Sequence, residues 1–149
     1  MRHVEIREMK EADIAAIVEI ENISFSTPWS SYSFKKEIYK PYSIPKVAVI
    51  NDRVVGYICA ERIIDEAHIL NLAVHPDFRK MGIGSLLVSN ILEELKSTGC
   101  RYVYLEVRAS NIAAKRLYER FGFKVIGVRK HYYIRPEEDA YVMMLELDE

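Results

Sequence analysis

Cysteine is scarce in this 149-residue sequence: Cys59 and Cys100 are the only two, and neither belongs to a Cys-x-x-Cys pair. A disulfide framework and a zinc site therefore have little support, and the four histidines form no metal-binding motif. Long apolar runs are also absent, since no stretch approaches the roughly 18 to 20 uncharged residues that a membrane span needs. The first residues enter an alternating pattern without the apolar segment of a signal peptide. We therefore expect a protein without metal or membrane, in a reducing cytoplasm.

A strong net charge is missing too, because 21 Lys and Arg residues are balanced by 22 Asp and Glu residues. The field of the whole protein thus favours no nucleic-acid partner. Lys124, Arg129 and Lys130 form a local basic run that could meet ribosomal RNA, but a solvated strand face is the commoner role of such a run. Half of the residues are apolar and the length suits one core, so we expect a single domain over residues 1–149.

Apolar residues recur with two different periods along the chain. Period-two alternation predicts strands, and 3.6-residue spacing predicts helices. Pro28-Trp29-Ser30 is expected to end the first helix, and Ser30 or Ser31 is suited to cap a short second one. The expected strands cover residues 4–8, 47–50, 54–64, 67–75, 102–107, 124–133 and 140–147, and the expected long helices cover residues 11–24, 83–96 and 111–121.

The order of these elements predicts the fold class. Asn51-Asp52-Arg53, between two β-rich runs, favours an antiparallel hairpin. The strand, helix, strand, helix order from residue 67 to residue 121 implies a parallel crossover. The sheet must therefore be mixed, in an α/β domain of three layers whose strands outnumber its helices.

The most informative segment joins an expected strand to an expected helix at residues 79–85. Gly82 and Gly84 lack Cβ atoms, so the backbone can turn tightly and bring successive N–H groups against an anion, while two preceding basic residues add charge. The loop is neither a Walker A sequence nor the Gly-x-Gly-x-x-Gly dinucleotide motif, because Leu87 stands where the third glycine would be. A diphosphate suits the loop better than a neutral ligand, and an ordinary turn before a helix is the alternative.

Further segments accompany this loop. They are Pro28-Trp29-Ser30, Leu105-Glu106-Val107-Arg108-Ala109-Ser110-Asn111, Leu117-Tyr118, Phe121-Gly122-Phe123, Tyr132-Tyr133 and Glu138-Asp139-Ala140. Together with Arg79-Lys80-Met81-Gly82-Ile83-Gly84, they resemble the motifs of the GCN5-related N-acetyltransferases (GNATs), whose Arg/Gln-x-x-Gly-x-Gly/Ala loop wraps the pyrophosphate of acetyl-CoA. The resemblance covers nearly the whole chain and points to the RimI/Ard1 branch, the enzymes that acetylate protein N-termini.

The resemblance implies the GNAT fold, with α/β/α layers, a mixed and mostly antiparallel sheet, and the parallel crossover at the CoA site. It also implies acetyl-CoA as cosubstrate. In the family the strand before the loop offers backbone groups to the pantetheine arm, and Val74 N–H is the candidate donor to the thioester oxygen. For Asn111, capping a helix is a sufficient alternative role. The residues implied in acetyl-CoA binding are Leu72, Ala73, Val74, Arg79, Lys80, Met81, Gly82, Ile83, Gly84, Ser85 and Asn111.

Three residues are candidates for proton transfer. Strand alternation separates Glu106 from its apolar neighbours, which suits its carboxylate to take a proton from an amine, whereas a surface ion pair is the alternative for an isolated glutamate. By resemblance, Tyr118 is the general acid that protonates the leaving thiolate, although its inward helix position would also suit a core tyrosine. His68, at the start of the strand before the loop, is the second candidate for proton handling.

Aromatic residues gather in the segments that the family uses to clamp an acceptor peptide. Trp29, Tyr32 and Tyr133 are the candidate substrate-binding residues, and some of these aromatics will belong to the core. By resemblance the acceptor is the N-terminus of a protein: a ribosomal-protein alanine for bacterial members, several N-termini for archaeal ones. We expect direct attack in a ternary complex, since neither cysteine has a motif-linked base. A GNAT acting on a small-molecule amine and a non-catalytic CoA-binding module are the alternatives.

Overall fold

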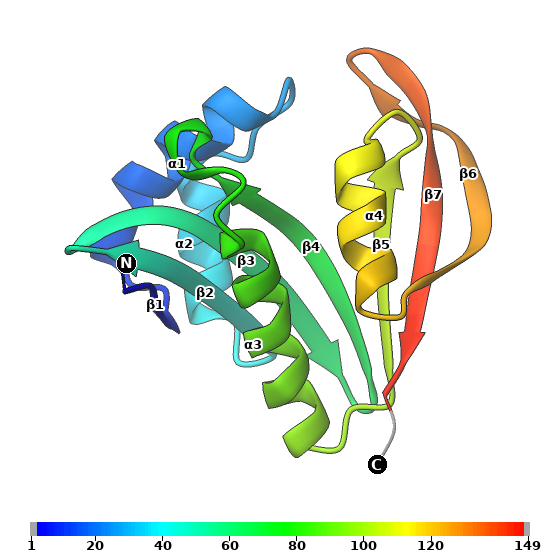
Figure 1. The fold of residues 1–149 in the computed structure, drawn as a ribbon, viewed down its shortest axis with the longest axis horizontal. Helices are drawn as coiled ribbons and strands as arrows, with labels where there is room; N and C mark the ends of the chain where they lie inside the picture. Colours follow the sequence, from blue (N-terminus) through cyan, green and yellow to red (C-terminus); the bar gives the residue numbers. More distant parts are fainter. Residues whose placement is uncertain (1–2, 148–149) are drawn as a thin grey trace.

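A seven-stranded sheet forms the middle layer of the structure, a computed structural model that describes residues 3–147. Its strands follow the order β1-β2-β3-β4-β5-β7-β6 (Figure 1). Within the described residues β4 and β5 form the one parallel pair, and the other five pairs are antiparallel. The strands are β1 (Glu5–Glu8), β2 (Ser43–Ile50), β3 (Arg53–Ile63), β4 (Glu66–Val74), β5 (Tyr102–Arg108), β6 (Lys124–Ile134) and β7 (Glu137–Glu146).

Helices cover both faces of this sheet. One face carries α1 (Ile14–Ser24) and α2 (Ser31–Tyr39), and the other carries α3 (Ile83–Ser97) and α4 (Ile112–Arg120) (Figure 1). Two short 3-10 turns, η1 (Glu11–Asp13) and η2 (Pro76–Phe78), precede α1 and α3. The predicted three-layer α/β fold with a mixed, mostly antiparallel sheet is confirmed, including the parallel crossover β4-α3-β5. In the described part of the chain, no helix has the length and apolar character that crossing a membrane demands.

Local chemistry explains the confirmed turns and caps. Asn51 and Asp52 adopt φ angles of 49° and 65°, the left-handed backbone that a tight hairpin between β2 and β3 requires and that Asn and Asp tolerate. Ser30 begins α2, because its Oγ accepts the N–H of Ser33 at 3.2 Å. Both features depend on residues close in sequence, and both were predicted.

Element boundaries differ from the sequence prediction where distant pairing decides them. The first helix is an exception, because η1 and α1 together cover the predicted residues 11–24; only its stop signal differs, since Phe25 is already extended before Pro28 is reached. Strand β2 begins at Ser43 instead of residue 47 because it pairs with β3 as far as Glu61. Strand β7 begins at Glu137 instead of residue 140 because it pairs with the end of β6.

The larger core lies between the sheet and the α3–α4 layer. Leu87, Ile91 and Leu95 repeat along α3 at helical spacing and are fully buried against the sheet. Tyr118 brings α4 into the same cluster. A second cluster on the opposite face joins α1 and α2 to the sheet through residues such as Phe34.

The sheet divides between β4 and β5. These strands pair only from Glu66 to His68 with Tyr102 to Tyr104, and beyond that point they diverge (Figure 1). A β-bulge lies in β4 just after the split, where the pairing with β3 skips Leu70. Bulges bend a strand and re-aim its side chains. The facing edges of β4 and β5 are therefore left without a strand partner.

Candidate active site

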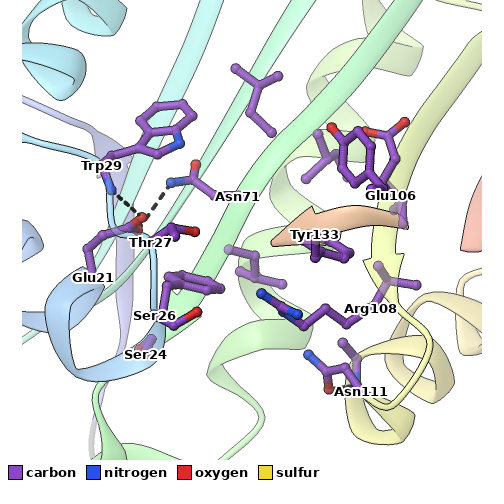
Figure 2. A pocket seen from close by; sticks show the side chains of 18 of the residues that line it. Glu21, Ser24, Ser26, Thr27, Trp29, Asn71, Glu106, Arg108, Asn111 and Tyr133 are labelled. Atoms are coloured by element: carbon purple, nitrogen blue, oxygen red, sulfur yellow. Dashed lines mark hydrogen bonds between the residues drawn. The ribbon is translucent and has the colours of Figure 1, made fainter. Parts of the chain in front are cut away.

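A cavity of about 530 Å³ lies where β4 and β5 separate (Figure 2). Its lining comes from the end of α1 and the loop that leads to α2, residues 69–72 of β4, residues 105–108 of β5, α4, and the end of β6. A cavity of this size, with a few convergent polar groups among apolar side chains, is typical of a small-molecule or cofactor site. The parallel crossover thus opens a site between the two halves of the sheet.

Glu106 lies on β5, two residues beyond the last pair that this strand forms with β4. Its neighbours Leu105 and Val107 are buried in the core beneath α3 and α4, so Glu106 points to the opposite face, as the alternation predicted. Its Oε1 lies 2.8 Å from Nε2 of His68. The Glu106 side chain is 12% exposed and the His68 side chain 42%. His68 therefore connects a nearly buried carboxylate in the cavity to solvent.

Tyr118 reaches the cavity from α4. Its ring packs edge-on against Phe123, with 5.4 Å between the ring centroids, and the residue is buried. Burial, together with nearby Tyr133, raises the pKa of Tyr118 above its ordinary value. Burial also raises the pKa of Tyr133, to about 12. Both phenols therefore keep their protons at neutral pH and can donate hydrogen bonds into the cavity.

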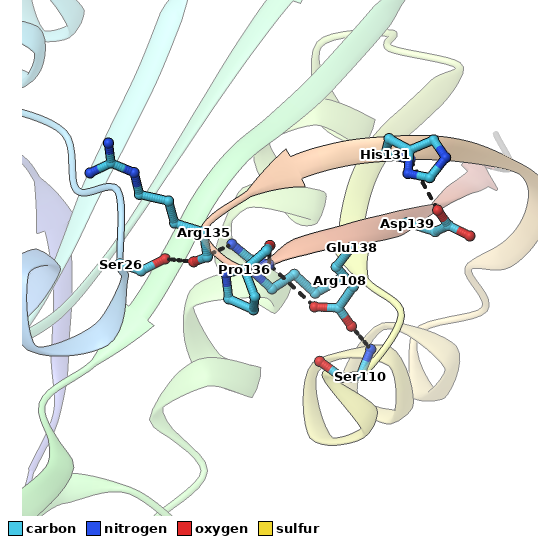
Figure 3. Close-up of polar contacts among 8 residues, drawn as sticks. All are labelled: Ser26, Arg108, Ser110, His131, Arg135, Pro136, Glu138 and Asp139. Atoms are coloured by element: carbon cyan, nitrogen blue, oxygen red, sulfur yellow. Dashed lines mark hydrogen bonds and ion pairs between the residues drawn. The ribbon is translucent and has the colours of Figure 1, made fainter.

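Arg108, the last residue of β5, holds the hairpin of β6 and β7 beside the cavity (Figure 3). Its guanidinium carbon lies 4.3 Å from the ring centroid of Tyr133, and its Nη1 donates to the carbonyl of Pro136 at 2.9 Å. The same nitrogen donates to Glu138, whose other carboxylate oxygen accepts the N–H of Ser110 before α4. One ion pair thus joins β5, the hairpin and the start of α4.

The α1–α2 loop touches the same hairpin. Ser26 Oγ donates a hydrogen bond to the carbonyl of Arg135 at the hairpin turn (Figure 3). Ser26 and Tyr133 both line the cavity. Two segments more than 100 residues apart in sequence therefore meet at the cavity.

Glu21 is the least expected polar group in the lining. It projects from α1 and is 2% exposed. Its Oε2 accepts the backbone N–H of Trp29 at 2.9 Å, and its Oε1 accepts Nδ2 of Asn71 at 3.3 Å (Figure 2). The hydroxyl of Tyr57 also donates to Oε1. Burial raises the pKa of Glu21, because the carboxylate is removed from water.

The loop before α3 offers unused hydrogen-bond donors. Among residues 3–147, no acceptor binds the N–H groups of residues 80–85. Gly82 has a φ of +80°, and a Cβ atom there would meet nothing within 4 Å. Lys80 also has a positive φ, of 63°. Free N–H groups at the start of a 15-residue helix attract an anion such as a phosphate.

The structure brings six of the sixteen predicted site residues to the cavity. Trp29, Leu72, Glu106, Asn111, Tyr118 and Tyr133 line the cavity. Ala73, Val74 and the loop from Arg79 to Ser85 are outside its lining and continue from it along β4 to the start of α3. Tyr32 lies apart on α2, 68% exposed, with Lys36 over its ring. Asn111 also caps α4, since its Oδ1 accepts the N–H of Ala114 at 3.1 Å.

Sequence reasoning gave no site role to several polar residues of the lining, among them Glu21, Asn71 and Arg108. Glu21 follows Ile17 and Ile20 on the buried stripe of α1, so a carboxylate in an apolar helical pattern was a readable signal. Asn71 faces Glu21 because of the bulge at Leu70, which no alternation pattern reveals. Arg108 was quoted within a motif but given no role. Among the described residues, no group of three or more His, Cys, Asp or Glu side chains is arranged to hold a metal ion.

Comparison with known proteins identifies the fold and its relatives. Residues 14–123 match the model of the Acetyltransferase (GNAT) family. The [ribosomal protein bS18]-alanine N-acetyltransferase of Salmonella typhimurium is 35% identical over 141 residues, which cover 93% of this chain and 95% of the relative.

Two solved structures share the whole architecture. The ribosomal-protein-S18-alanine N-acetyltransferase from Escherichia coli superimposes with a TM-score of 0.92 and 31% identity, covering 99% of this chain and 96% of that one. Ard1 from Thermoplasma volcanium superimposes with a TM-score of 0.90 and 29% identity, covering 98% and 99%. The family match, these relatives and the split sheet agree, and the chain belongs to the GNAT family of acetyltransferases.

Proposed function

We propose that this chain is an N-terminal acetyltransferase, which moves the acetyl group of acetyl-CoA to the α-amine of a protein, in one domain over residues 1–149. The observation that carries the proposal is the cavity at the strand split, which both Glu106 and Tyr118 line. A carboxylate and a protonated phenol beside one cavity suit the transfer of an acetyl group from sulfur to nitrogen. The relatives at 35% and 31% identity, which are named as ribosomal-protein alanine N-acetyltransferases, support the same reaction.

The chain offers groups that fit acetyl-CoA, which supplies an activated acetyl thioester when bound. The free N–H groups of residues 80–85 suit a pyrophosphate, and the left-handed backbone at Gly82 leaves open space above them. The unpaired edge of β4 suits the amides of a pantetheine arm, because buried backbone groups need partners. We therefore assign the pyrophosphate to Arg79–Ser85, the arm to the backbone of Leu72–Val74, and a further contact to Asn111.

Glu106 is assigned the role of general base. A protein α-amine has a pKa near 8, so part of it is already neutral at pH 7 and a carboxylate needs to remove only one proton, directly or through water. His68 Nε2, 2.8 Å from that carboxylate and partly exposed, is suited to orient it and to pass the proton toward solvent. The two candidate bases thus form one hydrogen-bonded pair.

Tyr118 is assigned the role of general acid. When the new C–N bond has formed and the C–S bond breaks, the electron pair stays on sulfur, and the phenol of Tyr118 supplies the proton. Burial raises the pKa of this phenol, which keeps it protonated at neutral pH but also makes it a weaker acid, so it first stabilises the developing thiolate by a hydrogen bond. Cys59 and Cys100 are buried, and burial raises the pKa of both thiols, which argues for direct transfer without an acyl-cysteine.

The acceptor N-terminus is assigned to the space between the α1–α2 loop and the β6–β7 hairpin. Trp29 and Tyr133 line that space and are the aromatic residues we expect an acceptor to contact, whereas exposed Tyr32 lies outside it. Alanine at the N-terminus of a ribosomal protein is the acceptor that the relatives' names support. Such substrates, together with acetyl-CoA, imply a cytoplasmic enzyme.

The deciding experiment is mass spectrometry of a peptide library that varies in its first two residues, incubated with acetyl-CoA and the purified protein. We expect a mass increase of one acetyl group on the α-amine, largest for peptides that begin with alanine. A parallel mixture of small amines and polyamines tests the alternative acceptor class. Acetylation of those amines but of no peptide would overturn the proposal, and no acetylation of either would favour a CoA-binding module.

A further inference from the structure

Glu21 differs from the other buried acids of the described residues. Asp13 has Arg7 at 2.8 Å and Glu37 has Lys40 at 3.0 Å, so each is neutralised by a cation. No cationic side chain in residues 3–147 forms an ion pair with Glu21. Its partners are neutral N–H and O–H donors. A buried carboxylate without a counterion is costly for folding, so its contacts invite a functional explanation.

The three donors to Glu21 come from three different segments of the chain. Trp29 donates its backbone N–H from the α1–α2 loop, and Asn71 donates from the bulged part of β4. Tyr57, fully buried on β3, donates its hydroxyl. Trp29 and Asn71 both line the cavity. The Glu21 carboxylate therefore ties one wall of the cavity, the α1–α2 loop, to another, the strand β4 (Figure 2).

Glu21 also decides how the Asn71 amide is turned. An ionised carboxylate accepts hydrogen bonds only, so it selects the NH₂ end of that amide. The other end, Oδ1 of Asn71, is buried and has no hydrogen-bond partner within the described residues. Within the described residues, the hydrogen bond to Glu21 is therefore the one contact that fixes the orientation of the Asn71 amide in the cavity wall.

We propose that Glu21 is a positioning residue for the acceptor peptide, because its carboxylate holds the backbone of Trp29 and the amide of Asn71 in the wall against which the acceptor lies. The proposal rests on the proposed N-terminal acetylation. Glu21 acts through these neighbours, since both of its oxygens are already engaged. None of its hydrogen-bond partners belongs to the residues assigned to acetyl-CoA, namely Leu72–Val74, Arg79–Ser85 and Asn111, so we expect its replacement to affect the acceptor and not acetyl-CoA.

The test compares Glu21→Gln with the matched control Glu19→Gln, which makes the same change on the exposed side of α1. With an alanine-initiated peptide, we expect Glu21→Gln to raise the KM for peptide roughly tenfold, because one hydrogen bond to a charged group is lost. The kcat and the KM for acetyl-CoA should stay within about twofold. An unchanged KM for peptide, or equal changes in the KM values of peptide and acetyl-CoA, would overturn the proposal. Asn71→Ala, which keeps the carboxylate, is a second variant and should raise the same KM.

Hydrogen–deuterium exchange gives a readout that needs no activity. The amides of residues 25–29 should exchange roughly tenfold faster in Glu21→Gln, while Glu19→Gln should match the wild type. Unchanged exchange would show that Glu21 does not hold the loop. A wild-type protein that acetylates no N-terminal peptide would refute the proposed function instead, so the two failures are distinguishable.

Discussion

Replacement of Glu106 by glutamine separates catalysis from binding. Glutamine has nearly the same shape, and its side-chain oxygen can still accept from His68 Nε2, which lies 2.8 Å from the carboxylate in the wild type. The core neighbours Leu105 and Val107 point to the other face and are untouched. The variant should therefore fold and bind acetyl-CoA normally while lacking the base.

The size of the effect follows from the protonation of the acceptor. A general base contributes about 10²- to 10⁴-fold. An α-amine with a pKa near 8 is about one tenth neutral at pH 7, and this fraction still reacts without a base. We therefore expect Glu106→Gln to lower kcat near the small end of that range, about 10²-fold at pH 7, or about 2.7 kcal/mol in activation free energy. At pH 9 roughly nine tenths of the amine is neutral, so the deficit should shrink about tenfold.

The assay measures initial rates of peptide acetylation by mass spectrometry from pH 6 to pH 9, with saturating acetyl-CoA. Calorimetry measures the affinity of each protein for acetyl-CoA. Equal losses of rate and of acetyl-CoA affinity would mean that Glu106 is structural. A deficit that stays constant with pH would refute proton removal from the amine as its role.

Three further predictions concern the coenzyme loop, the acid and the buried carboxylate. Gly82→Val should weaken acetyl-CoA binding, measured by calorimetry, at least about 100-fold, because valine strains a backbone with φ of +80° and fills the space above the loop. The control is Gly127→Val, where an added Cβ also meets nothing within 4 Å. Tyr118→Phe should lower kcat about 10²-fold, because the proton donor is lost, and an unchanged kcat would exclude the phenol as acid. Its melting temperature should stay near that of the wild type, because the ring contact with Phe123 remains. Burial raises the pKa of Glu21 above 4.5, so the stability that this carboxyl group adds at low pH is lost as the pH rises through its pKa in the folded protein. The Tm of Glu21→Gln relative to that of the wild type should therefore increase from pH 4.5 to pH 7.5. A Tm difference that stays constant with pH would contradict this.

The pH prediction isolates Glu21 because its titratable neighbours stay neutral. Burial raises the pKa of Tyr57 and of Cys59, both on β3, so neither loses a proton in this window. Any pH-dependent difference between the wild type and Glu21→Gln then belongs to the one carboxylate that was changed.

Much of the fold was readable from the sequence because it depends on neighbouring residues. Asn51 and Asp52 specify the hairpin between β2 and β3, and Ser30 specifies the start of α2. The helical spacing of Leu87 to Leu95 predicts the buried face of α3. The boundaries that were wrong, such as the starts of β2 and β7, depend on pairing with strands that the local pattern does not contain.

For the site, the sequence determined the chemistry on offer, and only the tertiary structure decided which groups meet. Alternation placed Glu106 away from the core, and the glycine loop before α3 predicted an anion site, because both signals are local. The separation of β4 from β5, the bulge at Leu70 and the burial of Glu21 bring residues 21–29 to the same cavity as β5 and α4. These contacts join segments some 50 to 100 residues apart, and their geometry is set by packing of the whole sheet, which no periodicity in one segment encodes.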